Sequence, residues 1–188
     1  MKTCIYQICY SKDTFENIPD GFLCLDHLKN ERPDWRELWP IRDFLKTNEL
    51  SDGVLYGFLS PKFSQKTLLN HQGVQDFLLA NYAGEDLVSF SPFWDLMAIF
   101  KNVFEQGDFF HPGLANTCQK LVSAYALDLN LADCIMSSQN TIFCNYFLAN
   151  KKFWMHWLTL ADYLFASSEE ENSDLYEELN APTSYGEQ

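Results

Sequence analysis

Short apolar runs separated by polar turns are the clearest pattern in the sequence. Three of these runs, at residues 4–10, 54–59 and 87–90, are rich in β-branched and aromatic residues, which is typical of buried strands. A fourth run, 141–149, predicts another strand, whereas residues 21–25 fit either a strand or a loop. Because the runs are apolar at nearly every position, they indicate strands covered on both faces, as in a parallel sheet.

Between these runs, apolar residues recur at intervals of three and four, which is the spacing of an amphipathic helix. The spacing predicts helices over 35–45, 74–82, 93–104, 118–125 and 153–165. Pro40 must start a turn of the first helix or kink it, and Gly107 is expected to end the third. Strands alternating with helices predict an α/β fold, a three-layer Rossmann-like arrangement with a mostly parallel sheet and flanking helices.

Length and charge divide the chain into a body and a tail. The 188 residues, 47% of them hydrophobic, suffice for one domain, which we expect over 1–166. Residues 167–188 carry seven acidic residues and no Lys or Arg, and predict an acidic, poorly ordered tail with at most a marginal helix near 175–179. Residues 1–166 contain 13 basic and 19 acidic residues, so their net charge is 13 − 19 = −6, compared with −13 for the whole chain.

The charge pattern also excludes classes of partner. No basic run is longer than Lys151-Lys152, so neither nucleic acid nor an anionic membrane surface is an expected partner. Aspartates and polar runs interrupt the apolar stretches, and no membrane-spanning helix is predicted. Six cysteines without a Cys-x-x-Cys, and a start without a secretion signal, favour buried free thiols and a cytoplasmic location.

Residues 30–42 are the richest candidate for ligand chemistry. They combine three Arg, three acidic residues and two Trp within thirteen positions. Aromatic faces stack on rings, Arg binds phosphate through two hydrogen bonds and carboxylates accept hydroxyl protons, which together suit a sugar-nucleotide pocket. A charged surface helix with buried tryptophans explains the same composition, so both interpretations stay open.

Polar residues at strand ends supply further candidates, because ligands of open α/β sheets bind outside the carboxyl ends of the strands. Ser60 and Ser91 follow two predicted strands, and Lys62 could offset a diphosphate, unless it is simply solvated. Asn145 could hold the neighbouring backbone or point at a ligand hydroxyl. Gly57 within a strand indicates a bulge or the close approach of another group.

A predicted loop at 107–114 holds Asp108 and His111, either of which could act as a general base. The alternative is a loop that satisfies its own backbone. Asp95 lies where a metal or a base could sit. Common phosphate-loop, dinucleotide, zinc-protease and hydrolase motifs are missing, as is an Asp-x-Asp pair for Mg²⁺ or Mn²⁺.

Three co-linear blocks carry a resemblance to a known family. They are Glu37-Leu38-Trp39-Pro40-Ile41-Arg42, then Tyr56-Gly57-Phe58-Leu59-Ser60-Pro61-Lys62, then Asn145-Tyr146-Phe147-Leu148 leading to Trp157-Leu158. In order and spread they resemble the small GT-A-type glycosyltransferases of capsule and lipopolysaccharide gene clusters. That family has an aromatic block (Glu-Leu…Tyr-Trp-x-Trp-Lys), a Gly-x-x-His-Tyr-Arg-Arg block on a core strand and an Asn-Met-Phe-Ile block. Ser60-Pro61-Lys62 departs from it by replacing His-Tyr-Arg, which reduces the positive charge to one lysine.

The resemblance implies a GT-A-like fold and transfer of a sugar from a nucleotide-sugar donor to a glycan acceptor, with or without Mg²⁺ or Mn²⁺, in surface polysaccharide synthesis. The candidate catalytic residues are then Asp108, His111 and Asp95. The candidate donor-binding residues are Glu37, Trp39, Arg42, Ser60, Lys62, Ser91 and Asn145. A non-catalytic module that binds a glycan or a protein is the main alternative, and a metal-independent hydrolase lacks a visible nucleophile.

Overall fold

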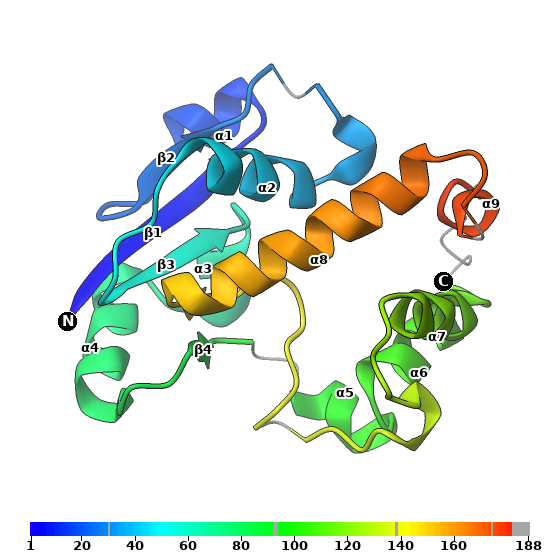
Figure 1. Ribbon diagram of the computed structural model, residues 1–188. Coiled ribbons are helices and arrows are strands. Elements are labelled where there is room, and N and C mark those ends of the chain that lie inside the picture. The colour runs from blue at the N-terminus through cyan, green and yellow to red at the C-terminus, as the bar shows by residue number, and fades with distance from the viewer. Residues whose placement is uncertain (30, 92–93, 138, 174, 182–188) are drawn as a thin grey trace. The chain divides into compact units, whose positions relative to one another are not determined.

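The computed structural model (Figure 1) describes residues 1–29, 31–91, 94–137, 139–173 and 175–181. The chain folds into two compact units. Unit 1 comprises Met1–Pro92 and Cys144–Thr159, and unit 2 comprises Phe93–Phe143 and Leu160–Gln188. The single domain expected over 1–166 stays a prediction. Phe93, the first residue of the helix predicted over 93–104, lies outside the described residues.

Unit 1 is built on a five-stranded sheet of order β2-β1-β3-β5-β4. Its strands are β1 (Lys2–Cys9), β2 (Leu23–Asp26), β3 (Val54–Leu59), β4 (Leu87–Ser89) and β5 (Phe147–Ala149). β1 pairs in parallel with both β2 and β3, whereas β5 pairs antiparallel with both β3 and β4. The α/β prediction is confirmed, but the sheet is mixed: β1 to β4 run one way and β5 runs against them.

Two predicted strands are shorter than their apolar runs. The run at 141–149 forms strand only at Phe147–Ala149, because Cys144 adopts a left-handed backbone with φ 58°, which an extended chain cannot contain. β4 covers Leu87–Ser89 and lies at the edge of the sheet, where its side chains are only half-buried. The ambiguous segment at 21–25 contributes β2, at the opposite edge.

Helices of unit 1 follow the strands in sequence. They are α1 (Lys12–Glu16), the 3₁₀ turn η1 (Pro33–Trp35), α2 (Leu38–Thr47), α3 (Phe63–Thr67), α4 (His71–Asn81) and α8 (Lys151–Glu169) as far as Thr159. Pro40 lies in the first turn of α2, where its missing N–H costs no helical hydrogen bond. Asn70 caps α4 by accepting the Gly73 N–H at 2.9 Å.

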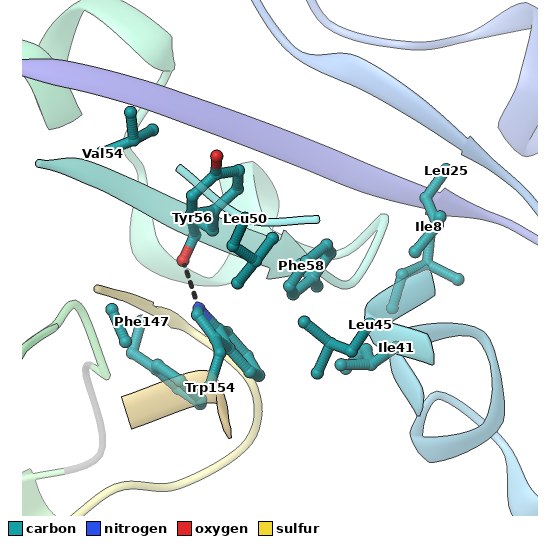
Figure 2. Packing of buried hydrophobic residues seen from close by; sticks show 11 residues of the cluster. Ile8, Leu25, Ile41, Leu45, Leu50, Val54, Tyr56, Phe58, Phe147 and Trp154 are labelled. Atoms are coloured by element: carbon teal, nitrogen blue, oxygen red, sulfur yellow. Dashed lines mark hydrogen bonds between the residues drawn. The ribbon is translucent and has the colours of Figure 1, made fainter. Parts of the chain in front are cut away.

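Both faces of the sheet are covered, which explains why every residue of β3 is buried. On one face, Tyr56 and Phe58 pack with residues of α2 and with Trp154 of α8 (Figure 2). The Trp154 indole N–H donates to the Tyr56 carbonyl at 3.0 Å. On the other face, Phe63 of α3 makes edge contacts with Phe22, Phe90 and Tyr146, beside the buried α4 residues Val74 and Leu78.

Unit 2 is helical in its described part. It holds α5 (Trp94–Ile99), α6 (Val103–Phe110), α7 (Leu114–Ala124), the 3₁₀ turn η2 (Leu131–Asp133), α8 from Leu160 and α9 (Tyr176–Leu179). The prediction of one helix over 93–104 is wrong. Asn102 breaks it with an extended backbone (φ −159°) and caps α6 by accepting the N–H groups of Phe104 and Glu105.

Gly107 does not end a helix, contrary to the sequence prediction, but lies inside α6. A Cβ at this position would come within 2.5 Å of Leu114 Cδ2. The glycine therefore permits the close approach of the start of α7.

The predicted boundary between body and tail falls inside α8, which continues to Glu169. Beyond it, Leu175 is buried, and Asn180 Nδ2 donates to the Ser168 carbonyl at 2.8 Å. α9 coincides with the marginal helix expected near 175–179, and its Glu178 pairs with Lys120 of α7.

Two further sequence predictions concern the whole chain. Among the described residues, no helix combines the length and apolarity needed to cross a membrane. The six cysteines are free thiols, but only Cys9 is buried, and Cys144 is exposed.

Candidate functional site

A cavity of about 550 Å³ in unit 1 opens at the carboxyl ends of β1 and β2. It is lined by the end of β1, the residue that follows β2, the turn η1 and the start of α2: Ile8, Tyr10, His27, Pro33, Trp35, Arg36, Glu37, Leu38 and Pro40. Ligands of open α/β sheets bind outside the carboxyl ends of the strands. We call it the larger hollow and take it as the candidate site.

The segment that forms the wall of the larger hollow is fixed by charge and aromatic contacts. Arg32 binds Asp34 through two nitrogens, at 2.7 and 3.1 Å, and this guanidinium holds the pKa of the Asp34 carboxyl below its usual range. Arg32 also lies over the rings of Trp35 and Trp39, at 5.9 and 5.7 Å. The buried Arg42 lies over Trp39 from α2, at 5.2 Å. Trp39 and Arg42 thus belong to one stack of alternating cations and indoles.

Arg36 has an unusual backbone, with φ 48° and ψ −129°, which is strained for a residue with a side chain. It is exposed and lines the larger hollow. The strained turn places the next residue, Glu37, at the N-terminus of α2. Strain of this kind persists where the surrounding structure enforces it, and functional sites are common among such places.

Glu37 brings together three of the predicted donor-binding residues. Its half-buried carboxylate is hydrogen-bonded by the side chains of Ser60 and Asn145. Ser60 follows β3 and Asn145 precedes β5. Because β5 runs antiparallel to β3, the carboxyl end of β3 and the amino end of β5 lie at the same end of the sheet, and so do these two residues. Burial raises the pKa of Glu37, and the two hydrogen bonds and the charge of Lys66 oppose that rise.

Glu37 also lines a second cavity, of about 200 Å³, which we call the smaller hollow. Its other lining residues come from α2, from the entry to β5 and from α8: Leu38, Ile41, Cys144, Asn145, Phe147, Trp154 and Trp157. Asn145 Nδ2 donates to the Phe58 carbonyl at 2.6 Å, while Asn145 Oδ1 is buried without a hydrogen-bond partner among the described residues. Glu37 therefore lines both hollows.

The other predicted donor-binding residues lie apart from the two hollows. Lys62 is exposed at the start of α3, and its backbone N–H approaches Ser60 Oγ at 3.4 Å. Ser91 is half-buried, and its N–H donates to Ser89 Oγ at 3.3 Å. Neither lines the larger or the smaller hollow as the described residues define them.

All three candidate catalytic residues belong to unit 2. Asp108 lies on α6 rather than in a loop, which corrects the sequence prediction for 107–110, and His111 follows the last residue of that helix. Asp108 Oδ1 accepts the N–H groups of Gly113 and Ala115, both at 2.9 Å, so this oxygen fixes the turn into α7. Asp95 is exposed in the first turn of α5.

Within the described ranges, no three His, Cys, Asp or Glu side chains converge as metal ligands do. The sequence prediction missed His27, Arg36 and Cys144 as lining residues. Arg36 was visible only as one of three arginines in 30–42, and Cys144 only as the neighbour of Asn145.

Comparison with known proteins gives no family model, no curated protein and no solved structure that matches the chain.

Proposed function

We propose that the protein is a glycosyltransferase that moves a sugar from a nucleotide-sugar donor to a glycan acceptor, in the synthesis of a surface polysaccharide. The observation that carries this proposal is the meeting of Glu37, Ser60 and Asn145, from three distant parts of the sequence, at a carboxylate that lines the larger hollow. All three belong to the blocks on which the family resemblance rests. The volume of the hollow, about 550 Å³, is in the range of ligand sites.

The larger hollow offers the groups that a nucleoside diphosphate requires. Tyr10 and Trp35 supply aromatic faces for a base or a sugar ring. Arg36 supplies an exposed guanidinium on the same wall, suited to two hydrogen bonds with a phosphate. In this proposal Arg36 takes the part expected of Arg42, whose guanidinium is buried over Trp39. The departing diphosphate would be stabilised by these fixed charges and dipoles.

Thermal unfolding in the presence of uridine, guanosine and thymidine diphosphates, with and without Mn²⁺, tests the proposal. One of the nucleotides should raise the melting temperature of the wild-type protein, since a ligand of the folded state stabilises it by mass action. Trp35→Ala should abolish that rise. Phe15→Ala is the matched control, because Phe15 is a half-exposed aromatic residue of α1 that does not line the larger hollow. No rise with any of the nucleotides at millimolar concentration would refute the proposal.

A non-catalytic module that binds a glycan is the second candidate. The engagement of Asp108 Oδ1 by two backbone N–H groups favours it, because this oxygen already serves to hold a turn. Under this alternative, glycosides raise the melting temperature and none of the nucleotide diphosphates does.

A further inference from the structure

The smaller hollow is lined by both aromatic rings and polar side chains. Trp154 lies between Phe147, which it stacks on at 5.2 Å with an interplanar angle of 19°, and Trp157, whose ring is tilted by 69° at 5.6 Å. Glu37 and Asn145 line the same hollow. Trp154 and Phe147 are buried, whereas Trp157 is half-buried and is the ring that a ligand in this hollow can reach. A ring beside hydrogen-bonding groups is suited to a ligand that is itself apolar on one face and polar at its rim.

One of the polar groups that line this hollow has no hydrogen-bond donor among the described residues. The amide nitrogen of Asn145 is engaged by the Phe58 carbonyl and by Glu37, whereas its oxygen is buried without a partner among the described residues. A buried acceptor without a donor is unfavourable, and this oxygen becomes available to a ligand hydroxyl only when the atoms that cover it move. The Glu37 carboxylate is a second acceptor. A sugar ring has a C–H face that can pack on an aromatic ring, and hydroxyl groups that can donate hydrogen bonds to these acceptors.

Building on the proposed function, we propose that the smaller hollow binds the terminal sugar of the glycan acceptor and that Glu37 is the general base for its reacting hydroxyl. Glu37 lines both hollows, so one carboxylate can face the acceptor in the smaller hollow and the donor in the larger one. The acceptor oxygen forms a bond to the anomeric carbon of the donor as its proton passes to Glu37. The bond from that carbon to the diphosphate oxygen breaks, and its electron pair leaves with the nucleoside diphosphate.

The surroundings of Glu37 suit this task. Burial raises the pKa of the carboxyl, which makes the carboxylate a stronger base than an exposed one. Ser60, Asn145 and the charge of Lys66 favour the ionised form, which a base requires. In unit 2, by contrast, Asp108 Oδ1 is already engaged by two backbone groups.

Two tryptophan variants separate the hollows. The probes are the methyl glycosides of glucose, galactose, mannose and rhamnose, with the nucleotide diphosphates named above. Trp157→Ala should weaken glycoside binding about tenfold, the loss of one ring contact, and leave nucleotide binding unchanged. Trp35→Ala should weaken nucleotide binding and leave glycoside binding unchanged. Equal glycoside binding by wild type and Trp157→Ala, with nucleotide binding intact, overturns this inference alone. Failure of every nucleotide to bind overturns the proposed function and the acceptor assignment with it.

A measurement on the wild-type protein covers the case in which Trp157→Ala does not fold. Cys144 is exposed and lines the smaller hollow, whereas Cys134 is a half-buried thiol of unit 2. A bound glycoside should slow alkylation of Cys144 by iodoacetamide, followed by mass spectrometry, and leave Cys134 unaffected. Equal protection of both thiols, or of neither, contradicts a sugar site in the smaller hollow.

Glu37→Gln tests the base directly, because glutamine keeps the shape of the side chain and cannot take the proton. With a binding nucleotide supplied as its sugar conjugate, kcat should fall by about 100- to 10,000-fold while KM for the glycoside changes little. The acid limb of the pH profile should disappear in this variant. A variant with unchanged kcat refutes the role of Glu37.

Discussion

Adding one methyl group at Gly57 should destabilise the sheet of unit 1. Gly57 lies in the middle of β3, and a Cβ built on it would come within 2.9 Å of Leu148 Cδ1 and 3.0 Å of Leu148 Cγ. Leu148 belongs to β5 and is fully buried, so its side chain can shift only against other buried groups. Gly57→Ala therefore requires the Leu148 side chain or the two strands to shift, at the place where the sheet changes from parallel to antiparallel pairing.

The size of the effect follows from two opposing contributions. An extra methyl group in a packed core costs about 1–3 kcal/mol. The backbone of Gly57 is not in the left-handed region, so alanine also restricts the unfolded chain and returns about 0.4–1 kcal/mol. The net loss should be about 1–2 kcal/mol of the free energy of unfolding. If Leu148 is the cause, the loss should disappear once that side chain is shortened.

Urea unfolding followed by tryptophan fluorescence measures this loss where it occurs, because four of the five tryptophans belong to unit 1. Leu148→Ala alone should cost about 2–5 kcal/mol. In the double variant the Gly57→Ala step should cost nothing or stabilise, a coupling of about 1–3 kcal/mol. Gly53→Ala is the control: it has φ 72° but no heavy atom within 4 Å, and should not couple to Leu148. Additive effects of Gly57→Ala and Leu148→Ala would refute the steric reasoning.

Three further predictions test the fold and the site. The pKa of Glu37 is raised in the folded state, so protonation of this carboxyl stabilises the fold fully below pH 4.5, and the stabilisation is lost as the pH rises through the folded pKa. Glutamine does not titrate. The melting temperature of Glu37→Gln, relative to that of wild type, should therefore increase from acid to neutral pH. Gly21 has a φ of 85°, and a Cβ added there would lie 2.5 Å from His71 Cγ. Gly84 has a φ of 110°, but a Cβ added there would have no neighbour within 4 Å. Gly21→Ala should therefore lower the melting temperature more than Gly84→Ala. Asp108→Ala should lose about 1–2 kcal/mol with its two backbone hydrogen bonds, measured by urea unfolding, whereas Asp108→Asn keeps an acceptor and should lose less; equal losses would contradict the capping interpretation.

The strands of unit 1 could be predicted because each buried strand is a short, continuous apolar run. Residues 54–59 are the clearest case, since the predicted and observed strands coincide. The direction of β5 could not be predicted, because the apolar pattern of a strand does not depend on whether its neighbour is parallel. Gly57 was informative for a different reason: glycine in such a run indicates that another chain segment comes close, and Leu148 is that neighbour.

The helices of unit 2 show where periodicity misleads. Apolar spacing continues from 93 to 104 without interruption, yet Asn102 ends that pattern as a cap. Its side chain accepts two N–H groups of α6 and donates to the carbonyls of Leu131 and Cys134. An asparagine that makes four such bonds overrides the apolar period, and two of its partners lie about thirty residues further along the chain, beyond any local pattern.

Arginines near tryptophans cannot be assigned from sequence, because the same pair suits a phosphate site and a cation–aromatic contact. The structure separates the three arginines of 30–42 by burial and position. Arg32 and Arg42 lie over indole rings, the latter buried, whereas Arg36 is exposed on the wall of the larger hollow. A phosphate needs a guanidinium that it can reach, so the strained residue beside Glu37, rather than the buried one on α2, is the cation on which donor binding in unit 1 should depend. Arg36→Gln should then weaken the nucleotide-dependent rise in melting temperature, and Arg42→Gln should lower the stability of the ligand-free protein.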